Sequence, residues 1–407
     1  MIDDIQQKRT WAVHRFINGE KPESICASLG CSRAWLYKWV SRFLDGDPFW
    51  VERRSPRPLS TPTRTPPETE EIVKLVRLNL YNQGLFCGAQ AIHWEMEELN
   101  VQPLPSIRTI GRILGHQGLT HRRTGRYESK GKAYPELPAL VPNQTHQADW
   151  VGPCYLKAPL RFHSLNVVDT ATGRCGLHPS VTKAGQQVID ALWAIWKRLG
   201  IPDNLQVDNE MSFYGSPIYP RGMGPLIRLC LHQGVEPWFI PMREPWRNGV
   251  VEKFNHHYEQ RFLRKVPMAT VPELLSGSLA YEQKHNSTYR YSKLGGKTPL
   301  KALEVAQRKL RFPKKEQPPH HRLKKPETGR YHLVRFIRSN LKLNIFGEMF
   351  HLPPELEYEY IVATIDIKEQ KLKLYLDNTE QLMFNYILPE KSVKMIFSLP
   401  PKTQIGL

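Results

Sequence analysis

The chain has 407 residues and carries 57 Lys and Arg against 39 Asp and Glu, a formal net charge of +18. This length exceeds one ordinary core and predicts two to four domains. A hydrophobic share of 40 % excludes a chain that is disordered throughout. The positive charge predicts an extended polyanion as partner, because binding one releases its counterions.

The six cysteines show no spacing that is typical of a zinc site or a redox pair, so we expect free thiols in a reducing compartment. They are Cys26, Cys31, Cys87, Cys154, Cys175 and Cys230. The sequence has no run of eighteen apolar residues and no apolar N-terminal segment typical of a signal peptide. We therefore expect a cytoplasmic protein.

Residues 1–50 predict a small all-helical domain with a helix-turn-helix. Its second helix is closed by Gly30, and Ser32 can cap a third helix that carries Trp35. The second helix of such a motif enters the major groove of DNA, which makes Arg33 and Lys38 candidate DNA contacts. A plain helical hairpin with its tryptophans in the core is the alternative.

Residues 51–67 predict a stiff linker that is rich in proline and arginine. Similar basic arms lie in the minor groove beside a helix-turn-helix, and a solvated spacer is the other interpretation. The candidate DNA contacts in and beside this linker are Arg53, Arg54, Arg57 and Arg64.

Residues 68–120 predict a second helix-turn-helix domain. Helical spacing recurs at 68–82, 88–99 and 106–115, and the last of these carries Arg108 and Arg112. Two reading domains joined by an arm can span more than one turn of duplex. A second basic linker at 121–140 follows, in which Arg122 and Arg123 are further candidate DNA contacts.

Residues 141–305 predict a mixed α/β sheet covered by helices. The expected strands are 145–151, 162–168, 174–181 and 204–207, and the expected helices are 184–199, 223–234, 249–264 and 271–286. A basic linker at 306–330 leads to a C-terminal region at 331–400, where a small closed β-barrel would leave no exposed strand edges. The expected strands there are 331–337, 341–346, 349–352, 359–367, 371–376 and 380–387.

Three carboxylates stand in settings that suit a metal site. Asp149 lies within a strand, Asp208 ends one, and Glu252 lies near the start of a helix. Two Mg²⁺ ions need bridging hard oxygen ligands, which acidic side chains from separate elements of one sheet can supply. A single aspartate of this kind is more often a turn cap, which is how we interpret Asp169.

These residues resemble the retroviral-integrase-like family of transposases, the DDE recombinases. The resemblance is carried by Asp149 in its strand, by Asp208-Asn209, by the segment 248–255 and by the segment 294–299. It covers about residues 140–305 and implies a bacterial insertion-sequence transposase, associated with the nucleoid. The implied fold is an α/β RNase H-like catalytic core at 141–305, with N-terminal all-α helix-turn-helix domains and the small C-terminal β-barrel.

The third acid is a choice between Glu244, at the family's usual spacing from the second aspartate, and Glu252, eight residues further on. We favour Glu252, because Glu244 precedes Pro245 and is biased to extended structure. Glu252 lies one turn into a helix that Asn248 can cap. The expected buried stripe of that helix is Val251, Phe254, Tyr258 and Phe262. A second departure from the family is Glu210, which stands where glycine is common.

The resemblance implies catalysis by Asp149, Asp208 and Glu252, each also a metal ligand, with two Mg²⁺ ions per site and Mn²⁺ as a substitute. We expect Asp149 to bridge the two ions. Water then hydrolyses the 3′ end of the element, and the freed 3′-hydroxyl attacks target DNA without a covalent protein intermediate. Arg247, Lys253 and Asn255 are candidate phosphate contacts.

The expected partner is double-stranded DNA, both element ends and target. Two ends must meet, so the resemblance implies a dimer or a higher synaptic complex on DNA, and it leaves accessory transposition proteins open. Solvent-facing or DNA-facing roles are expected for His256 and His257. The alternatives are a catalytically inactive, sequence-specific DNA-binding regulator derived from a transposase, and a nuclease that cuts without joining.

Overall fold

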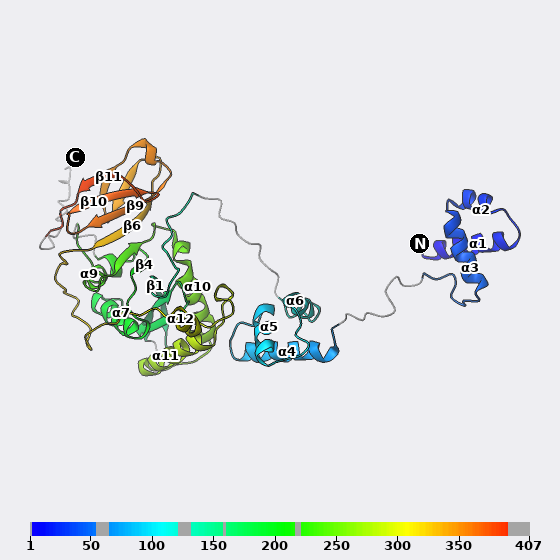
Figure 1. Ribbon diagram of the computed structural model, residues 1–407, viewed down its shortest axis with the longest axis horizontal. Coiled ribbons are helices and arrows are strands. Elements are labelled where there is room, and N and C mark those ends of the chain that lie inside the picture. Colours follow the sequence, from blue (N-terminus) through cyan, green and yellow to red (C-terminus); the bar gives the residue numbers. More distant parts are fainter. Residues whose placement is uncertain (1, 54–64, 121–131, 158–159, 216–220, 390–407) are drawn as a thin grey trace, which may run out of the picture. The chain divides into compact units, whose positions relative to one another are not determined.

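The computed structural model describes residues 2–53, 65–120, 132–157, 160–215 and 221–389, and it divides into two compact units, Met1–Pro66 and Pro67–Leu407 (Figure 1). Most of the two basic arms falls outside the described residues. The candidate DNA contacts Arg54, Arg57, Arg64, Arg122 and Arg123 lie there.

The first unit is the expected set of three helices, α1 (Ile2–Ile17), α2 (Pro22–Leu29) and α3 (Arg33–Leu44). Gly30 ends α2 in the left-handed conformation, with φ of 58°, which glycine adopts without a steric penalty. The Ser32 hydroxyl accepts the backbone N–H of Trp35 and caps α3. Ile25 and Leu36 are fully buried where the helices meet.

The second unit begins with three further helices, α4 (Pro67–Asn82), α5 (Ala89–Glu98) and α6 (Ile107–His116). Ser106 caps α6 by accepting the N–H of Thr109. The apolar side chains that these helices share form a core of their own, in which Val73, Ile92 and Ile110 are fully buried.

A mixed sheet follows. Strands β1 (Thr145–Tyr155), β2 (Arg161–Asp169) and β3 (Cys175–Ser180) are antiparallel, and β4 (Asn204–Val207) and β5 (Glu236–Phe239) run parallel to β1. The order from one side is β5-β4-β1-β2-β3. The expected mixed sheet is confirmed, and β5 is a strand that the sequence did not predict.

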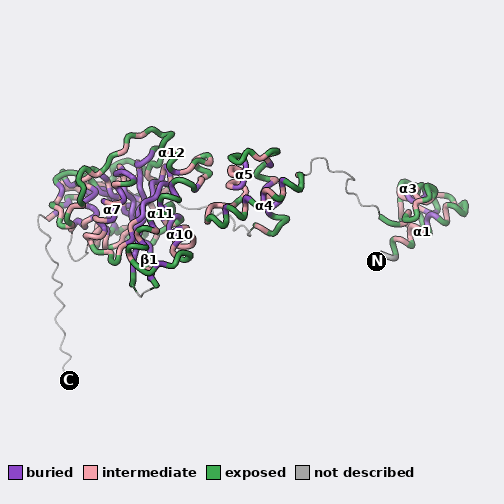
Figure 2. Tube along the Cα trace, turned by 90° about the horizontal axis from the view of Figure 1, so that it is seen from below, coloured by how far each residue is buried: buried purple, intermediate pink, exposed green. Residues whose placement is uncertain are grey.

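Helices cover both faces of this sheet. Side chains along its strands point to opposite faces and enter two separate hydrophobic cores. Leu165 and Val167 of β2 face a core shared with α7 and α9, whereas Phe162 and Val168 face a core shared with α10 and α11. Figure 2 shows buried residues along β1, α7 and α11. The helices of this region are α7 (Gly185–Leu199), α8 (Met211–Tyr214), α9 (Pro225–His232), α10 (Gly249–Tyr258), α11 (Val271–Thr288) and α12 (Pro299–Ala306).

The C-terminal strands extend the same sheet, and the expected closed barrel is not formed by the described residues. Strand β6 (Arg330–Phe336) pairs in parallel with β5, and β9 (Tyr360–Asp366), β10 (Lys371–Leu376) and β11 (Thr379–Asn385) follow it to make nine strands. In the expected barrel, closure would give the edge strands a hydrogen-bonding partner. In the structure, β6 finds its partner in β5 instead. A separate hairpin is formed by β7 (Lys342–Ile345) and β8 (Glu348–His351).

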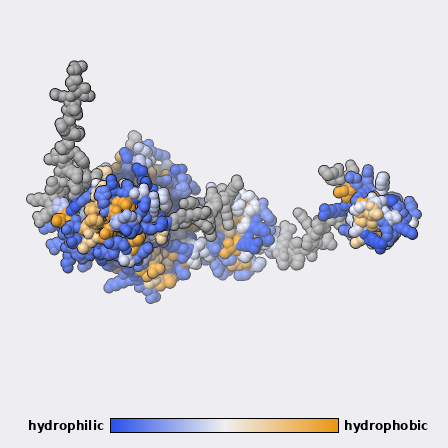
Figure 3. Space-filling model, turned by 90° about the horizontal axis from the view of Figure 1, so that it is seen from above, coloured by the Kyte–Doolittle hydropathy of each residue, from blue (hydrophilic) through white to orange (hydrophobic). Residues whose placement is uncertain are grey.

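The surface is mainly hydrophilic in the view of Figure 3, with hydrophobic patches between the charged side chains. Within the described residues, no helix is long and apolar enough to cross a membrane. Trp246 lies in the short helix η1 (Pro245–Asn248), which precedes α10, and this residue is 62 % exposed. The segment that joins β5 to α10 therefore reaches the surface.

Candidate active site

Asp149 and Asp208 lie side by side on neighbouring parallel strands. The ladder between β1 and β4 pairs Thr145 with Asn204 and Gln147 with Gln206. Continuing this register by two residues sets Asp149 opposite Asp208, which follows β4 directly. Both carboxylates thus stand where β1 passes the end of β4, because paired parallel strands keep their residues level.

Helix α10 is tied to β1 next to these aspartates. The side-chain oxygen of Gln147 accepts the backbone N–H groups of Val250 and Val251, at 2.9 and 3.1 Å. Asn248 donates its amide to the carbonyl of Ala148, at 3.0 Å. The side chain of Asn248, the expected cap, therefore binds the strand, and Gln147 caps α10 instead. No local sequence pattern indicates this role for Gln147, because it is far from α10 in the chain.

The same helix presents two side chains toward Asp149. Glu252 lies in its first turn, and Asn255, one turn further, donates its amide to Asp149 at 2.9 Å. Asn255 is buried and also accepts a hydrogen bond from Asn166 at 2.8 Å. The structure thus shows Asn255 holding the carboxylate of Asp149, and the expected phosphate contact of Asn255 stays a prediction. The stripe Val251, Phe254, Tyr258 and Phe262 is buried, as expected.

The pKa values of all three carboxylates are raised, and that of Asp149 is affected by the charges of the other two. Burial first, and then the charges of Asp208 and Glu252, raise the pKa of Asp149 to about 7, although hydrogen bonds from Trp150 N–H and Asn255 oppose this. Burial and the charge of Asp208 also raise the pKa of Glu252. Burial is the main cause that raises the pKa of Asp208. The site therefore holds negative charge that the surrounding protein does not compensate.

The donor chemistry of this trio fits a hard divalent cation such as Mg²⁺, which prefers carboxylate oxygens and would relieve the mutual repulsion. In the part of the chain that the structure describes, no three His, Cys, Asp or Glu side chains lie close enough together to enclose a metal ion as they stand. The three residues nevertheless fit the ion in kind and charge.

Glu244, the competing third acid, is already engaged. Its carboxylate accepts the Tyr360 hydroxyl at 2.8 Å and the Arg247 guanidinium at 3.1 Å. The Arg247 guanidinium also lies over the ring of Tyr134, 4.0 Å from its centre. Glu244 and Asp208 do line one small cavity of about 270 Å³, but the Glu244 oxygens face the C-terminal strands through Tyr360. Arg247, a predicted phosphate contact, is held in the same cluster.

The other residues that the sequence analysis singled out differ in how exposed they are. Asp169 closes the turn after β2, where its carboxylate accepts the N–H of Ala171 and the hydroxyl of Thr172, as expected of a turn cap. His256 is exposed, whereas His257 packs edge-on against Phe86, with ring centres 5.3 Å apart. The described candidate DNA contacts with exposed side chains are Arg33, Lys38, Arg53, Arg108, Arg112 and Lys253.

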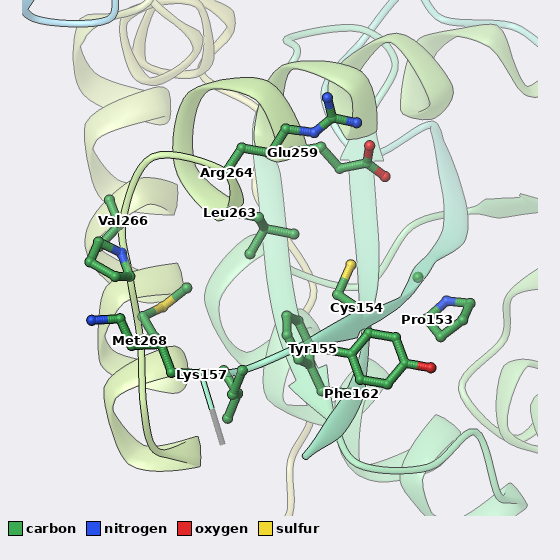
Figure 4. Close-up of a pocket in the computed structure, with 13 residues that line it drawn as sticks. Pro153, Cys154, Tyr155, Lys157, Phe162, Glu259, Leu263, Arg264, Val266 and Met268 are labelled. Carbon is green, nitrogen blue, oxygen red and sulfur yellow. The ribbon is translucent and has the colours of Figure 1, made fainter. Parts of the chain in front are cut away.

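A larger cavity of about 460 Å³ lies away from the carboxylates, beside the far part of β1 (Figure 4). Tyr155 and Phe162 line it on the sheet side, and Glu259 and Arg264 line it from the chain that continues α10. That continuation is a π-helical turn, η2 (Glu259–Leu263). None of Asp149, Asp208 and Glu252 lines this cavity, so its size does not identify the site.

Comparison with known proteins adds two findings. A family model described as a homeodomain-like domain matches residues 4–50. Solved structures with a likeness to the chain include the HTLV-2 integrase catalytic core domain in complex with magnesium, at 18 % identity and a TM-score of 0.31, covering 41 % of this chain and 99 % of that one. The N-terminal region is therefore similar to a domain type that the helix-turn-helix pattern predicted.

Two further structures show the same kind of likeness. The BIV integrase catalytic core matches at 15 % identity with a TM-score of 0.31, covering 40 % of this chain and 96 % of that one. An integrase chain of the simian T-cell lymphotropic virus intasome, in complex with the PP2A regulatory subunit B56 gamma, matches at 15 % identity with a TM-score of 0.35, covering 79 % of this chain and 99 % of that one.

Proposed function

We propose that this protein is a DNA transposase that binds the terminal repeats of its mobile element, hydrolyses the 3′ ends and joins the freed 3′-hydroxyls to target DNA. The observation that carries the proposal is the carboxylate trio. Asp149 stands opposite Asp208, and an α10 capped by Gln147 brings Glu252 to them. Three half-buried acids whose pKa values are all raised are costly unless a cation or substrate uses them.

The architecture supports this proposal. The strand order β5-β4-β1-β2-β3, with three antiparallel strands and two parallel ones, is the order expected of an RNase H-like core. The homeodomain-like match at 4–50 and the second capped helical set at α4–α6 supply two candidate DNA-reading domains. The net charge of +18 favours a long polyanion over a small substrate.

In this proposal Asp149, Asp208 and Glu252 hold the magnesium ions. Bound magnesium supplies a more acidic water or hydroxyl and stabilises charge on the phosphate. The chain's own residues fix the ligands: Asn255 and the Trp150 N–H hold the two oxygens of Asp149 by hydrogen bonds of 2.9 and 2.8 Å. The carboxylate of Asp149 is therefore oriented by its own surroundings before DNA arrives. The exposed Lys253, next to Glu252, is positioned to bind a DNA phosphate.

The test uses the sequences that flank the gene, as labelled duplexes of the two element ends, in Mg²⁺ or Mn²⁺. We expect 3′-end nicking and joining by the wild type, and loss of both by at least about 10³-fold in Asp149→Asn, Asp208→Asn and Glu252→Gln, with end binding retained. Glu244→Gln is the matched control, because it removes one charge from the same segment.

Three results separate the alternatives. Binding of the ends without nicking by the wild type would identify a regulator that retains the fold. Cutting without joining would identify a nuclease. Activity in Glu252→Gln together with its loss in Glu244→Gln would move the third ligand to Glu244 and refute the assignment made here.

A further inference from the structure

Lys183 lies in the segment between β3 and α7, beside the carboxylate site. Its ammonium donates to Glu210 at 2.9 Å and lies 5.8 Å from the centre of the Trp150 ring. Trp150 directly follows Asp149, and Glu210 comes two residues after Asp208. Lys183 is therefore next to both segments that carry the aspartates, on a different element from α10.

A chain of hydrogen bonds fixes this position. The Trp150 indole donates to the Ser212 hydroxyl at 3.2 Å, and that hydroxyl donates to one Glu210 oxygen at 3.1 Å. The other Glu210 oxygen holds Lys183, and the Glu210 N–H donates to Asp208 at 3.1 Å. Both oxygens of Glu210 are thus used, and the lysine is held against the loop that presents Asp208.

The ammonium keeps binding capacity in this arrangement. A lysine carries three donors, and Glu210 is the one hydrogen-bond partner of Lys183 among the described residues. Its side chain is 26 % exposed, so the residue is not sealed inside the protein. A positive charge at this edge is what a phosphate entering an acidic site needs.

We propose that Lys183 binds a non-bridging oxygen of the scissile phosphate. The inference rests on the proposed transposase function and adds a substrate-binding residue on the Asp208 side, opposite α10. Glu210 is then a positioning residue, because it holds the lysine through a contact of 2.9 Å and occupies a place where the resembling family commonly has glycine. Loop closure by an ordinary ion pair is the competing explanation, and it involves no contact with DNA.

The experiment measures whether the contribution of Lys183 to DNA binding depends on the negative charge of the scissile phosphate. Nicking by the wild type first maps the scissile position in the element-end duplex. Binding is then measured in EDTA for the ordinary duplex and for one with a neutral methylphosphonate at that position, with the wild type, Lys183→Ala and Lys183→Arg. The ratio of the two dissociation constants is compared between proteins, as in a double-mutant cycle.

We expect Lys183→Ala to change this ratio by about tenfold, in the direction that makes the charged phosphate less favoured, because a charge-assisted hydrogen bond is lost. Lys183→Arg should keep most of the wild-type ratio. The matched control is Lys197→Ala on α7, because that side chain is 29 % exposed and pairs with Glu316, so it loses a similar ion pair. Its ratio should equal that of the wild type.

An unchanged ratio in Lys183→Ala, with nicking by the wild type intact, would overturn the role of Lys183 and leave the proposed function standing. Absence of nicking by the wild type would overturn both. If Lys183→Ala does not fold, as judged by its thermal transition, Lys183→Gln takes its place, because glutamine can still donate to Glu210 but lacks the charge.

Discussion

Asp149 is the central residue of the proposed site. Its carboxylate is held by Asn255 and by the Trp150 N–H, yet burial and two neighbouring acids still raise its pKa to about 7. The hydrogen bonds fix its orientation, and they do not remove its electrostatic cost. A carboxylate with such a raised pKa is stabilised by protonation or by a bound cation. Either effect can be measured without an activity assay.

The first prediction concerns stability against pH in the absence of metal. The folded pKa of about 7 lies above the ordinary value of 3.8, so the folded state holds this proton more tightly than the unfolded state does. The contribution of Asp149 to stability is therefore present at low pH and is lost as pH rises through about 7. Urea unfolding in EDTA should show Asp149→Asn more stable than the wild type at pH 8, by about 2–4 kcal/mol.

That advantage should shrink at pH 5, where the wild-type carboxyl is protonated in the folded state. The asparagine amide is expected to accept one of the two hydrogen bonds less well than the carboxyl group of the wild type does, which reduces the gain by about 1 kcal/mol. An Asp149→Asn variant that is less stable than the wild type at pH 8 and pH 5 alike would contradict the electrostatic account.

The second prediction concerns metal binding. Millimolar Mg²⁺ or Mn²⁺ should raise the thermal midpoint of the wild type at pH 8, because a ligand that binds only the folded state stabilises it. The shift should vanish in Asp208→Asn and in Glu252→Gln, and it should persist in Glu244→Gln. Calorimetry of the four proteins checks this, and an equal shift in all of them would mean that the trio is not the metal site.

At the scale of elements, the position of α10 favours Glu252 over Glu244 as the third acid of the proposed site. Its N-terminus is anchored to β1 by Gln147 and Asn248, and its first turn then faces Asp149. The choice of Glu252 over Glu244 could be argued from Pro245 and from the helical stripe alone. The cap could not, because Gln147 lies more than 100 residues before the helix that it caps.

The third prediction tests this anchor. Gln147→Leu leaves two N–H groups of α10 without their partner, which should lower the free energy of unfolding by about 1–2 kcal/mol and reduce nicking more than end binding. Gln147→Glu keeps an acceptor at a helix N-terminus and should restore most of the stability. Chemical denaturation of both variants provides the measurement, and equal stability of Gln147→Leu and the wild type would show that the cap is dispensable.

At the scale of the whole molecule, the nine-stranded sheet joins regions that the sequence separates. His332 of β6 stacks on Trp238 of β5, with ring centres 4.0 Å apart, and hydrogen bonds to Glu236 and Thr364. One hydrophobic core runs from Phe239 through Leu333 to the strands beyond. The C-terminal strands are therefore part of the fold that carries the site, since Tyr360 of β9 also holds the Glu244 cluster.

The fourth prediction follows from this continuity. A chain that ends after Ala306 loses β6 and exposes the edge of β5, together with the core that β6 covers. We expect it to lack the cooperative unfolding transition of the full chain, as followed by circular dichroism and urea. A truncated chain with that transition intact would mean that the C-terminal strands fold as a separate domain, as the barrel prediction implied.

The sequence by itself determined the local features of this protein. Capping serines, a closing glycine and apolar periodicity place α1 to α6, and β4 is predicted at its observed bounds, because these signals act within a few residues. Asp149, Asp208 and Glu252 could be named from their settings for the same reason. Strand β5 was missed because it has four residues and contains Pro237, which argues against a strand.

Only the tertiary structure decided what lies next to what. The capping of α10 by Gln147, the contact of Lys183 with Glu210 and the continuation of β5 by β6 each join residues far apart in the chain. Such pairings depend on where each strand edge and each unpaired backbone N–H or C=O group finds a hydrogen-bond partner in the whole fold. The sequence alone offers several possible partners for each of them. The three acids of the proposed site could therefore be named from the sequence, where their role is a prediction, whereas the residues that contact them could be found only in the structure.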